Sequence, residues 1–162
     1  NIYQDSPEWL AQNQRSTRNF IRKWGHFVKH DSLMKPIILP KYDIGFRVLK
    51  CNSEFLEVLE PWCSSILIDD EMQVLTSHYV DKEQKNTLFK LNERIKSTPF
   101  ESLNNEIIVT IDRETFTQQD FQIIQQLSEI VKDSGQVGEF ELGNLFINIV
   151  QMNEYQNKLI KL

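Results

Sequence analysis

The sequence predicts an α/β fold: an N-terminal helix, then a β-α-β-α-β-α-β-β domain with a small, mostly parallel sheet and an antiparallel edge hairpin. Three observations predict it. Residues 42–69 place an amphipathic segment between two apolar runs, as in a β-α-β unit. Helical and strand patterns then alternate along the chain, which favours parallel strands with helices against them. A final apolar stretch is divided by Gly143-Asn144, a dipeptide typical of a tight hairpin turn.

The first predicted element is a helix between residues 6 and 25. Ser6 suits the N-cap, and Pro7 fits the first helical position because a proline there loses no helical hydrogen bond. Gly25 stands where a helix would end. We therefore expect an amphipathic helix of about five turns.

Residues 26–41 predict an extended connector. Pro36 and Pro40 bracket an apolar triplet, and proline disfavours a central strand because it cannot donate a ladder hydrogen bond. We expect the boundary between two parts of the chain to lie here. We expect residues 1–41 to form a terminal helix with its connector, and residues 42–162 to form an α/β domain.

The β-α-β unit is predicted from three apolar patterns in succession. They are a period-two alternation, a helical spacing and a short continuous run suited to a buried parallel strand. Their residues are, in turn, Ile44, Phe46 and Val48; Phe55, Val58, Leu59 and Trp62; and Ile66, Leu67 and Ile68.

The middle of the domain is less regular. Residues 72–79 are compatible with a short strand or a loop. A helix is predicted from residue 81 to 96, because Asp81 and Gln84 have the spacing of a capping box and Pro99 follows as a stop.

The last third predicts a strand, a helix and the hairpin. Residues 105–112 hold a strong apolar run. Thr117 has the position of a helix cap with Asp120 three residues on, and Phe116 and Phe121 occupy the positions of a hydrophobic staple. We expect about four or five strands in all.

The composition excludes some classes of function. Residues 1–50 carry nine Lys and Arg against four Asp and Glu, and residues 51–162 carry nine against nineteen. The split suggests that the two parts face each other, or that the basic part faces an acidic partner. An acidic domain argues against nucleic-acid binding. No run approaches the roughly 18 apolar residues of a membrane helix, so we expect no membrane insertion.

The two cysteines predict a reducing compartment. Cys51 and Cys63 lie at opposite ends of the helix in the β-α-β unit, too far apart for a disulfide. We expect them to be small buried apolar residues of a cytoplasmic protein.

Basic residues of the first helix are the candidate binding residues. Arg15, Arg18 and Arg22 share one helical face, with Lys23 beside them. The pattern favours a solvated basic face over an anion or sugar-phosphate site. Neither a glycine-rich phosphate loop nor a G-x-S-x-G nucleophile motif occurs in the sequence.

Two pairs of residues are candidate metal ligands. Asp69 and Asp70 follow the second predicted strand, where open α/β sheets often bind ligands, although a solvated acidic loop is the favoured alternative. His26 and His30 are four residues apart and on a helix would share a face. A glycine ends the predicted helix just before them, which favours polar residues of a connector.

A family resemblance is carried by the stretch NQRSTRNFIRKWGH. It resembles the closing helix of family 2 glycosyltransferases with the GT-A fold, and the matching residues are Asn13, Arg15, Phe20, Lys23, Trp24 and Gly25. The remainder is similar to the C-terminal extension of bacteriophage-type and related viral glycosyltransferase-like proteins. The resemblance implies a parent enzyme that transfers a sugar from a nucleotide donor with a divalent cation. Asp69-Asp70 is not the Asp-x-Asp motif of such enzymes, so no catalytic residue is carried over.

The leading hypothesis is a C-terminal portion of a glycosyltransferase-like protein that serves as a non-catalytic module for assembly, partner or acceptor binding. Its partner would be the remainder of a longer polypeptide or another protein, with a carbohydrate acceptor as a further candidate. No cofactor is predicted for this chain itself. One alternative is a small metal-dependent enzyme using Asp69 and Asp70. Another is an oligomeric structural protein of a virus particle, made in the cytoplasm of an infected host.

Overall fold

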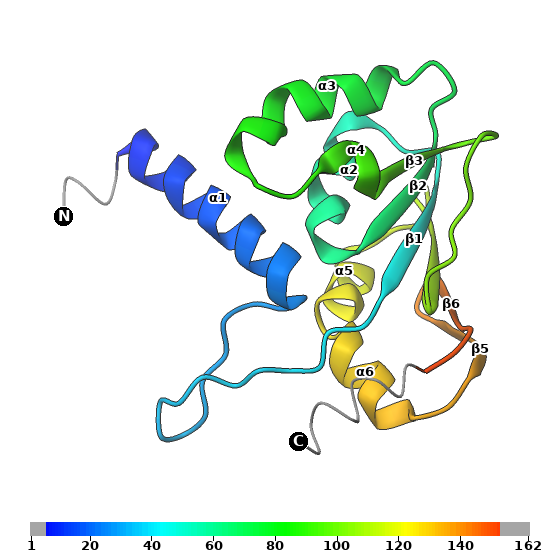
Figure 1. The fold of residues 1–162 in the computed structure, drawn as a ribbon. Coiled ribbons are helices and arrows are strands. Elements are labelled where there is room, and N and C mark those ends of the chain that lie inside the picture. The colour runs from blue at the N-terminus through cyan, green and yellow to red at the C-terminus, as the bar shows by residue number, and fades with distance from the viewer. Residues whose placement is uncertain (1–5, 153–162) are drawn as a thin grey trace.

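The structure is a computed structural model that describes residues 6–152. Figure 1 shows an α/β fold, as predicted, with an N-terminal helix and a mixed sheet. The helices are α1 (Pro7–Trp24), α2 (Ser53–Leu59), α3 (Val74–Glu83), α4 (Leu91–Arg94), α5 (Gln118–Gln125) and α6 (Leu127–Ser134), with short 3-10 turns η1 (Glu60–Trp62) and η2 (Gln84–Asn86). The strands are β1 (Ile44–Leu49), β2 (Ser65–Asp69), β3 (Ile95–Thr98), β4 (Ile107–Asp112), β5 (Gly138–Leu142) and β6 (Leu145–Ile149).

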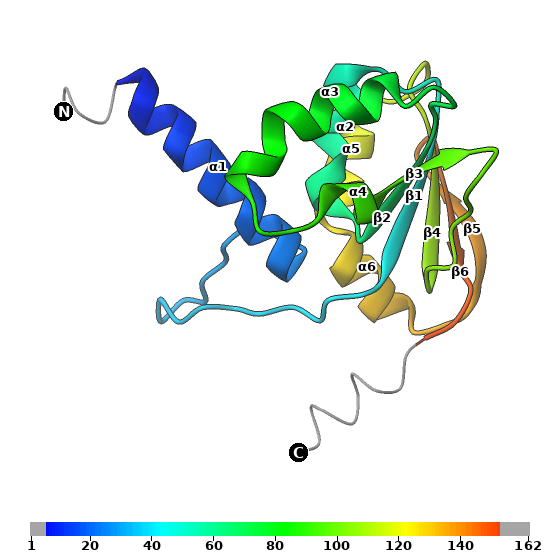
Figure 2. The same ribbon diagram turned by 45° about the horizontal axis from the view of Figure 1, so that its top comes forward.

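The sheet has the strand order β3-β2-β1-β4-β6-β5. The first four strands of this order are parallel, and Phe46 of β1 stands between Ile66 of β2 and Val109 of β4. The hairpin of β5 and β6 then adds an antiparallel edge next to β4. Figure 2 shows the helices gathered on one side of this sheet. The fold is therefore a two-layer arrangement, and the prediction of a mostly parallel sheet is confirmed.

The core lies between the helices and one face of the sheet. Alternate residues of each central strand face the helices and are buried, because successive side chains of a strand point to opposite faces. This buried set includes Ile44, Phe46, Val48, Ile66, Ile68, Ile107, Val109, Ile111, Leu145, Ile147 and Ile149, with Leu56, Leu59, Ile124, Leu127 and Val131 from the helices. On the other face Arg47 is exposed. The alternation expected for the first strand of the β-α-β unit is confirmed.

Helix α1 begins and ends at the predicted residues. The Ser6 hydroxyl accepts a hydrogen bond from the Trp9 amide at 3.1 Å, and Pro7 is the first helical residue. Gly25 adopts a left-handed conformation with φ 82°, and its amide donates to the Ile21 carbonyl at 2.7 Å. A residue with a Cβ is strained in that conformation, which explains the glycine.

The capping box of α5 is also confirmed. The Thr117 hydroxyl accepts from the Asp120 amide at 3.2 Å, and the Asp120 carboxylate accepts from the Thr117 amide at 2.9 Å. The rings of Phe116 and Phe121 lie 6.3 Å apart, as a hydrophobic staple requires. Asp120 also accepts two hydrogen bonds from Asn144, so the predicted hairpin turn is tied to the start of α5.

The prediction for the middle of the domain is wrong in two respects. Residues 72–79, for which a short strand or a loop was predicted, belong mostly to α3. In place of the predicted helix over residues 81–96 the chain forms η2, α4 and the strand β3. With β3 the sheet has six strands, whereas about four or five were predicted. The helix starts early because Asp70 accepts hydrogen bonds from two amides of its first turn, Leu75 at 3.2 Å and Thr76 at 2.9 Å. Because Asp70 caps α3 ahead of Asp81, the predicted capping box of Asp81 and Gln84 does not mark the start of a helix.

The connector lacks helix and regular strand, as predicted. Its local structure is an antiparallel bridge between His30 and Pro36, closed by a turn in which Asp31 accepts from the amides of Leu33 and Lys35. Figure 1 shows this segment looping away from the sheet between α1 and β1. The division of the chain at residue 41 stays a prediction. Both cysteines are free thiols.

Candidate functional site

The junction between α1 and the α/β domain is the candidate site. Helix α1 contacts η1 and α3 through its C-terminal half, from which Arg18 and Arg22 reach Glu83 of α3 and Arg22 reaches Glu60 of η1. Two of its residues are buried there, Ile21 and Arg22. Phe20 and Trp24 flank them, with ring centroids 6.3 Å apart. An arginine therefore occupies a position where an amphipathic helix usually buries an apolar side chain.

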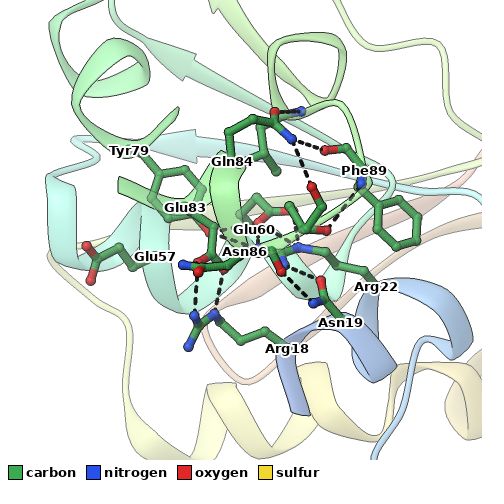
Figure 3. Close-up of polar contacts among 12 residues, drawn as sticks. Arg18, Asn19, Arg22, Glu57, Glu60, Tyr79, Glu83, Gln84, Asn86 and Phe89 are labelled. Carbon is green, nitrogen blue, oxygen red and sulfur yellow. Dashed lines mark hydrogen bonds and ion pairs between the residues drawn. The ribbon is translucent and has the colours of Figure 1, made fainter. Parts of the chain in front are cut away.

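Arg22 is the centre of a buried ionic network (Figure 3). Its Nη2 lies 2.6 Å from Glu60 Oε1 and 2.7 Å from Glu83 Oε2, and the side chains of Arg22 and Glu60 are both 0% exposed. The Tyr79 hydroxyl donates to Glu60 Oε1 at 2.7 Å. Arg94 donates from Nε to Glu60 Oε2 at 2.8 Å. Each carboxylate oxygen of Glu60 thus has a charged partner, which buried charges require.

A second layer connects the network to the surface (Figure 3). Arg18 donates to both oxygens of Glu83, at 2.6 and 2.9 Å, which is the bidentate geometry that arginine makes with a carboxylate. Asn86 donates to Glu83 at 3.0 Å, and Asn19 donates to the Asn86 carbonyl at 2.8 Å. The Asn19 side chain also accepts from Arg22 at 2.8 Å. Two successive turns of α1 are thereby attached to the α3–η2 segment.

Arg22 and Glu83 are both charged at neutral pH. Burial alone raises the pKa of Glu83, but hydrogen bonds from Arg18, Arg22 and Asn86 outweigh it and lower that pKa to about 2. Burial disfavours the charged form of Arg22, yet the hydrogen bond and charge of Glu60 raise its pKa above the usual value. Burial and the neighbouring Glu60 raise the pKa of Tyr79. The tyrosine therefore stays neutral and donates a hydrogen bond to Glu60.

A pocket of about 340 Å³ opens beside the network, between α1, α2 and α3. Its cations are Arg15, Arg18 and Lys82, its acids are Glu57 and Glu83, and the rest of the lining is Ala11, Gln14, Val58, Tyr79 and Asn86. Lys82 pairs with Glu57 at 2.5 Å. Arg15 donates to the neutral side chain of Gln12 at 2.7 Å. The pocket is suited to binding a polar group, and its three cations outnumber its two acids.

The structure separates the four basic residues predicted as a binding set. Arg15 and Arg18 line the pocket described above. Arg22 is buried, so the prediction that it belongs to a solvated face is wrong, because two acids distant in sequence surround it. Lys23 is exposed, with its ammonium 5.1 Å from the centroid of the Trp24 ring. It lines a different pocket, with Leu88 and Phe89.

The two predicted acidic ligands point in different directions. Asp69 is exposed at the end of β2, whereas Asp70 is buried and accepts hydrogen bonds at the start of α3, including one from the Thr76 hydroxyl at 2.8 Å. Within residues 6–152 no three or more His, Cys, Asp or Glu side chains are grouped as a metal would require. A metal site at Asp69 and Asp70 stays a prediction.

The two histidines are not on a helix. His26 is buried, with Nδ1 2.5 Å from the Phe27 carbonyl oxygen and Nε2 accepting from the Leu39 amide at 3.3 Å. His30 is exposed at the bridge to Pro36. The spacing of four residues therefore does not bring the two rings onto one helical face, although binding of a metal by either is untested.

Sequence reasoning missed the acids and the hydroxyl that hold Arg22. Glu60, Tyr79 and Glu83 lie 38, 57 and 61 residues beyond it, so no local spacing connects them. One signal was present. Glu60 is a lone acid inside the largely apolar stretch from Val58 to Trp62, and an acid in such a stretch needs a buried partner.

Comparisons with protein-family models, with curated proteins and with solved structures find no match. None of the helices described is both long enough and apolar enough to cross a membrane.

Proposed function

We propose that this chain is the C-terminal portion of a glycosyltransferase-like protein, and that it is a non-catalytic module that holds the closing helix of a catalytic domain against an accessory α/β domain. The observation that carries this proposal is the buried network of Arg22, Glu60 and Glu83. The stretch that resembles glycosyltransferases lies on the same helix as Arg22.

The network is suited to fixing the position of a helix. Apolar contacts are non-directional and tolerate small shifts, whereas buried charges are costly unless every partner is in place. Arg22 makes hydrogen bonds to Glu60 from η1 and to Glu83 from α3, and Arg18 adds a bidentate bond one turn earlier. A rotation or a sliding of α1 would break several of these bonds together. The helix and the domain should therefore move as one body.

The N-terminal half of α1 is left for a further contact. Figure 1 shows it extending beyond the α/β domain. Leu10 in this half is 47% exposed. In a longer polypeptide this half would lie within the catalytic domain, so that the ionic network would transmit the position of that domain to the accessory one.

The acid-base chemistry of the junction supports a non-catalytic role. A general acid or base works best when its pKa lies near the working pH. The pKa of Glu83 is instead lowered to about 2, and that of Tyr79 is raised by burial. Neither group is poised to exchange a proton at neutral pH.

Two measurements test the proposal. The intact mass of the protein from its natural source should exceed the 19.2 kDa of this sequence, and the additional N-terminal sequence should contain an Asp-x-Asp motif. The purified chain should transfer no sugar when it is given nucleoside-diphosphate sugars with Mn²⁺. A native mass equal to that of this chain, or sugar transfer by the chain alone, would contradict the proposal.

A further inference from the structure

A second pocket lies at the carboxyl ends of the central strands. The chain passes from β1 through α2 to β2 on one side, while β4 lies on the other side of β1. The strand order therefore reverses between β1 and β4. In open α/β sheets ligands bind outside the carboxyl ends at such a reversal, because the connecting segments diverge there and leave a crevice.

The pocket at this position has a volume of about 320 Å³. It is lined by residues from α2 and its N-cap and from the loop after β4, namely Asn52, Glu54, Phe55, Val58, Arg113 and Phe116. Three of these six side chains are apolar, and Val58 is 44% exposed. An apolar wall open to solvent at the reversal point favours a ligand with an apolar body.

Ring contacts fix the apolar wall. Phe55 and Phe116 meet edge to face with centroids 5.0 Å apart, and Phe116 lies 6.3 Å from Phe121. Phe121 in turn meets Trp62 edge to face at 5.9 Å. The wall is thus anchored to a row of aromatic residues that reaches the core. Little ordering would be needed when a ligand binds, and such preorganisation favours affinity.

Arg113 supplies the cation of the pocket. Its Nε donates to the Lys50 carbonyl at 2.5 Å, and its amide donates to the Leu49 carbonyl at 3.2 Å. Lys50 has φ 59°, a left-handed conformation that is uncommon for lysine. Its own ammonium is neutralised by Glu114 at 2.7 Å. Among the described residues the terminal guanidinium nitrogens of Arg113 have no hydrogen-bond partner.

We propose that this pocket binds a small anion with a planar apolar body. A carboxylate or phosphate would bind the terminal nitrogens of Arg113, and the body would lie against Phe55, Val58 and Phe116. This site is separate from the α1 network and does not depend on the function proposed for it. Charged hydrogen bonds from arginine to such anions are among the strong ones in proteins.

The test uses the full chain and NMR of its phenylalanine rings. Phenylacetate and phenyl phosphate are the probes, and acetate and phenylacetamide are controls that lack the ring or the charge. We expect saturable shifts of the Phe55 and Phe116 signals with at least one probe. Both controls should bind with an affinity lower by roughly tenfold or more. The probe that binds distinguishes a carboxylate from a phosphate site.

Variants assign the binding to the pocket. Arg113→Gln should weaken binding of the active probe by roughly tenfold or more. Val58→Glu, which places a second acid at the wall, should weaken it as well and gives an independent result where the first variant is poorly folded. Arg47→Gln changes an exposed arginine on the open face of the sheet and should leave affinity unchanged. The proposal would be overturned if neither probe gave saturable shifts, or if Arg113→Gln and Val58→Glu both bound the active probe with the affinity of the wild type.

Discussion

The sheet core and the α1 junction are buried to the same degree with opposite chemistry. Phe46 and Ile66 in the core are 0% exposed, and so are the side chains of Arg22 and Glu60 in the junction. The core is held by non-directional apolar contact, which a local pattern of residues specifies. The junction is held by directional charged hydrogen bonds between distant parts of the chain. Burial alone therefore does not tell which kind of residue a position needs.

The two regions should respond differently to the loss of one group. A truncated core residue loses its transfer free energy and leaves a cavity. A truncated junction residue leaves charges that are buried and unpaired. Four changes test this contrast, in decreasing order of expected effect.

Phe46→Ala should have the largest effect. The side chain is 0% exposed at the centre of the sheet, so the free energy of unfolding should fall by about 4 kcal/mol. Urea unfolding followed by circular dichroism measures it. Val58→Ala is the matched control, because Val58 is 44% exposed and its truncation should cost less than about 1 kcal/mol. Equal losses in the two variants would show that the buried face does not hold the fold together.

Arg22→Met should lower the free energy of unfolding by about 3 kcal/mol. Methionine preserves much of the side-chain volume, so the loss reports mainly the charged hydrogen bonds from Arg22 to Glu60 and Glu83. After the change Glu60 still has Arg94, and Glu83 still has Arg18, as a charged partner. The control is Lys23→Met, which removes a positive charge from the next residue of α1, where the side chain is exposed. Urea unfolding should separate the two variants clearly, and a difference below about 0.5 kcal/mol would argue against a stabilising network.

Acid should weaken the junction through Glu83. Its pKa is lowered from 4.5 to about 2 in the folded protein, so the stabilisation is fully present above about pH 4.5 and is lost as the pH falls towards 2. The loss should be about 2 kcal/mol after solvent screening is allowed for. Unfolding of wild type and Glu83→Gln between pH 7 and pH 2 measures it. The stability gap between them should shrink on acidification; a gap that stays constant would show that Glu83 is not the titrating group.

The ion pair of Glu57 and Lys82 should contribute least. It lies at the rim of the same junction, but the two side chains are 33% and 62% exposed. Solvent screens such a pair, so a double-mutant cycle with alanine should give a coupling free energy of about 0 to 0.5 kcal/mol. The equivalent cycle for Arg22 and Glu60 should give a coupling several times larger. Similar values for the two cycles would remove the distinction between the buried network and the surface.

Local patterns predicted the parts of the fold that depend on neighbours in sequence. The ends of α1, the capping box at Thr117 and the β-α-β unit all follow from residues a few positions apart. The strand β3 was missed because three of its four residues, Lys96, Ser97 and Thr98, are polar. It pairs with β2 at the edge of the sheet, and only the tertiary structure supplies that partner.

The candidate site was predicted only in part. The helical spacing correctly places Arg18 and Arg22 on one side of α1. That side was predicted to be solvated, but it contacts the domain, where both arginines bind Glu83. Helical spacing cannot tell whether that side faces water or buried acids. The acids come from η1 and α3. The position of α3 was predicted wrongly, because the residues that follow the capping side chain of Asp70 carry no apolar helical stripe.

The claim that the buried network makes α1 part of the fold can be measured by amide hydrogen exchange. Exchange of the amides of residues 19–24 should be compared between wild type and Arg22→Met, with the amides of β4 as an internal reference. We predict that exchange in α1 becomes about 100-fold faster in the variant while β4 keeps its protection. Unchanged protection of α1 in the variant would contradict the claim and would assign the attachment of the helix to its apolar contacts.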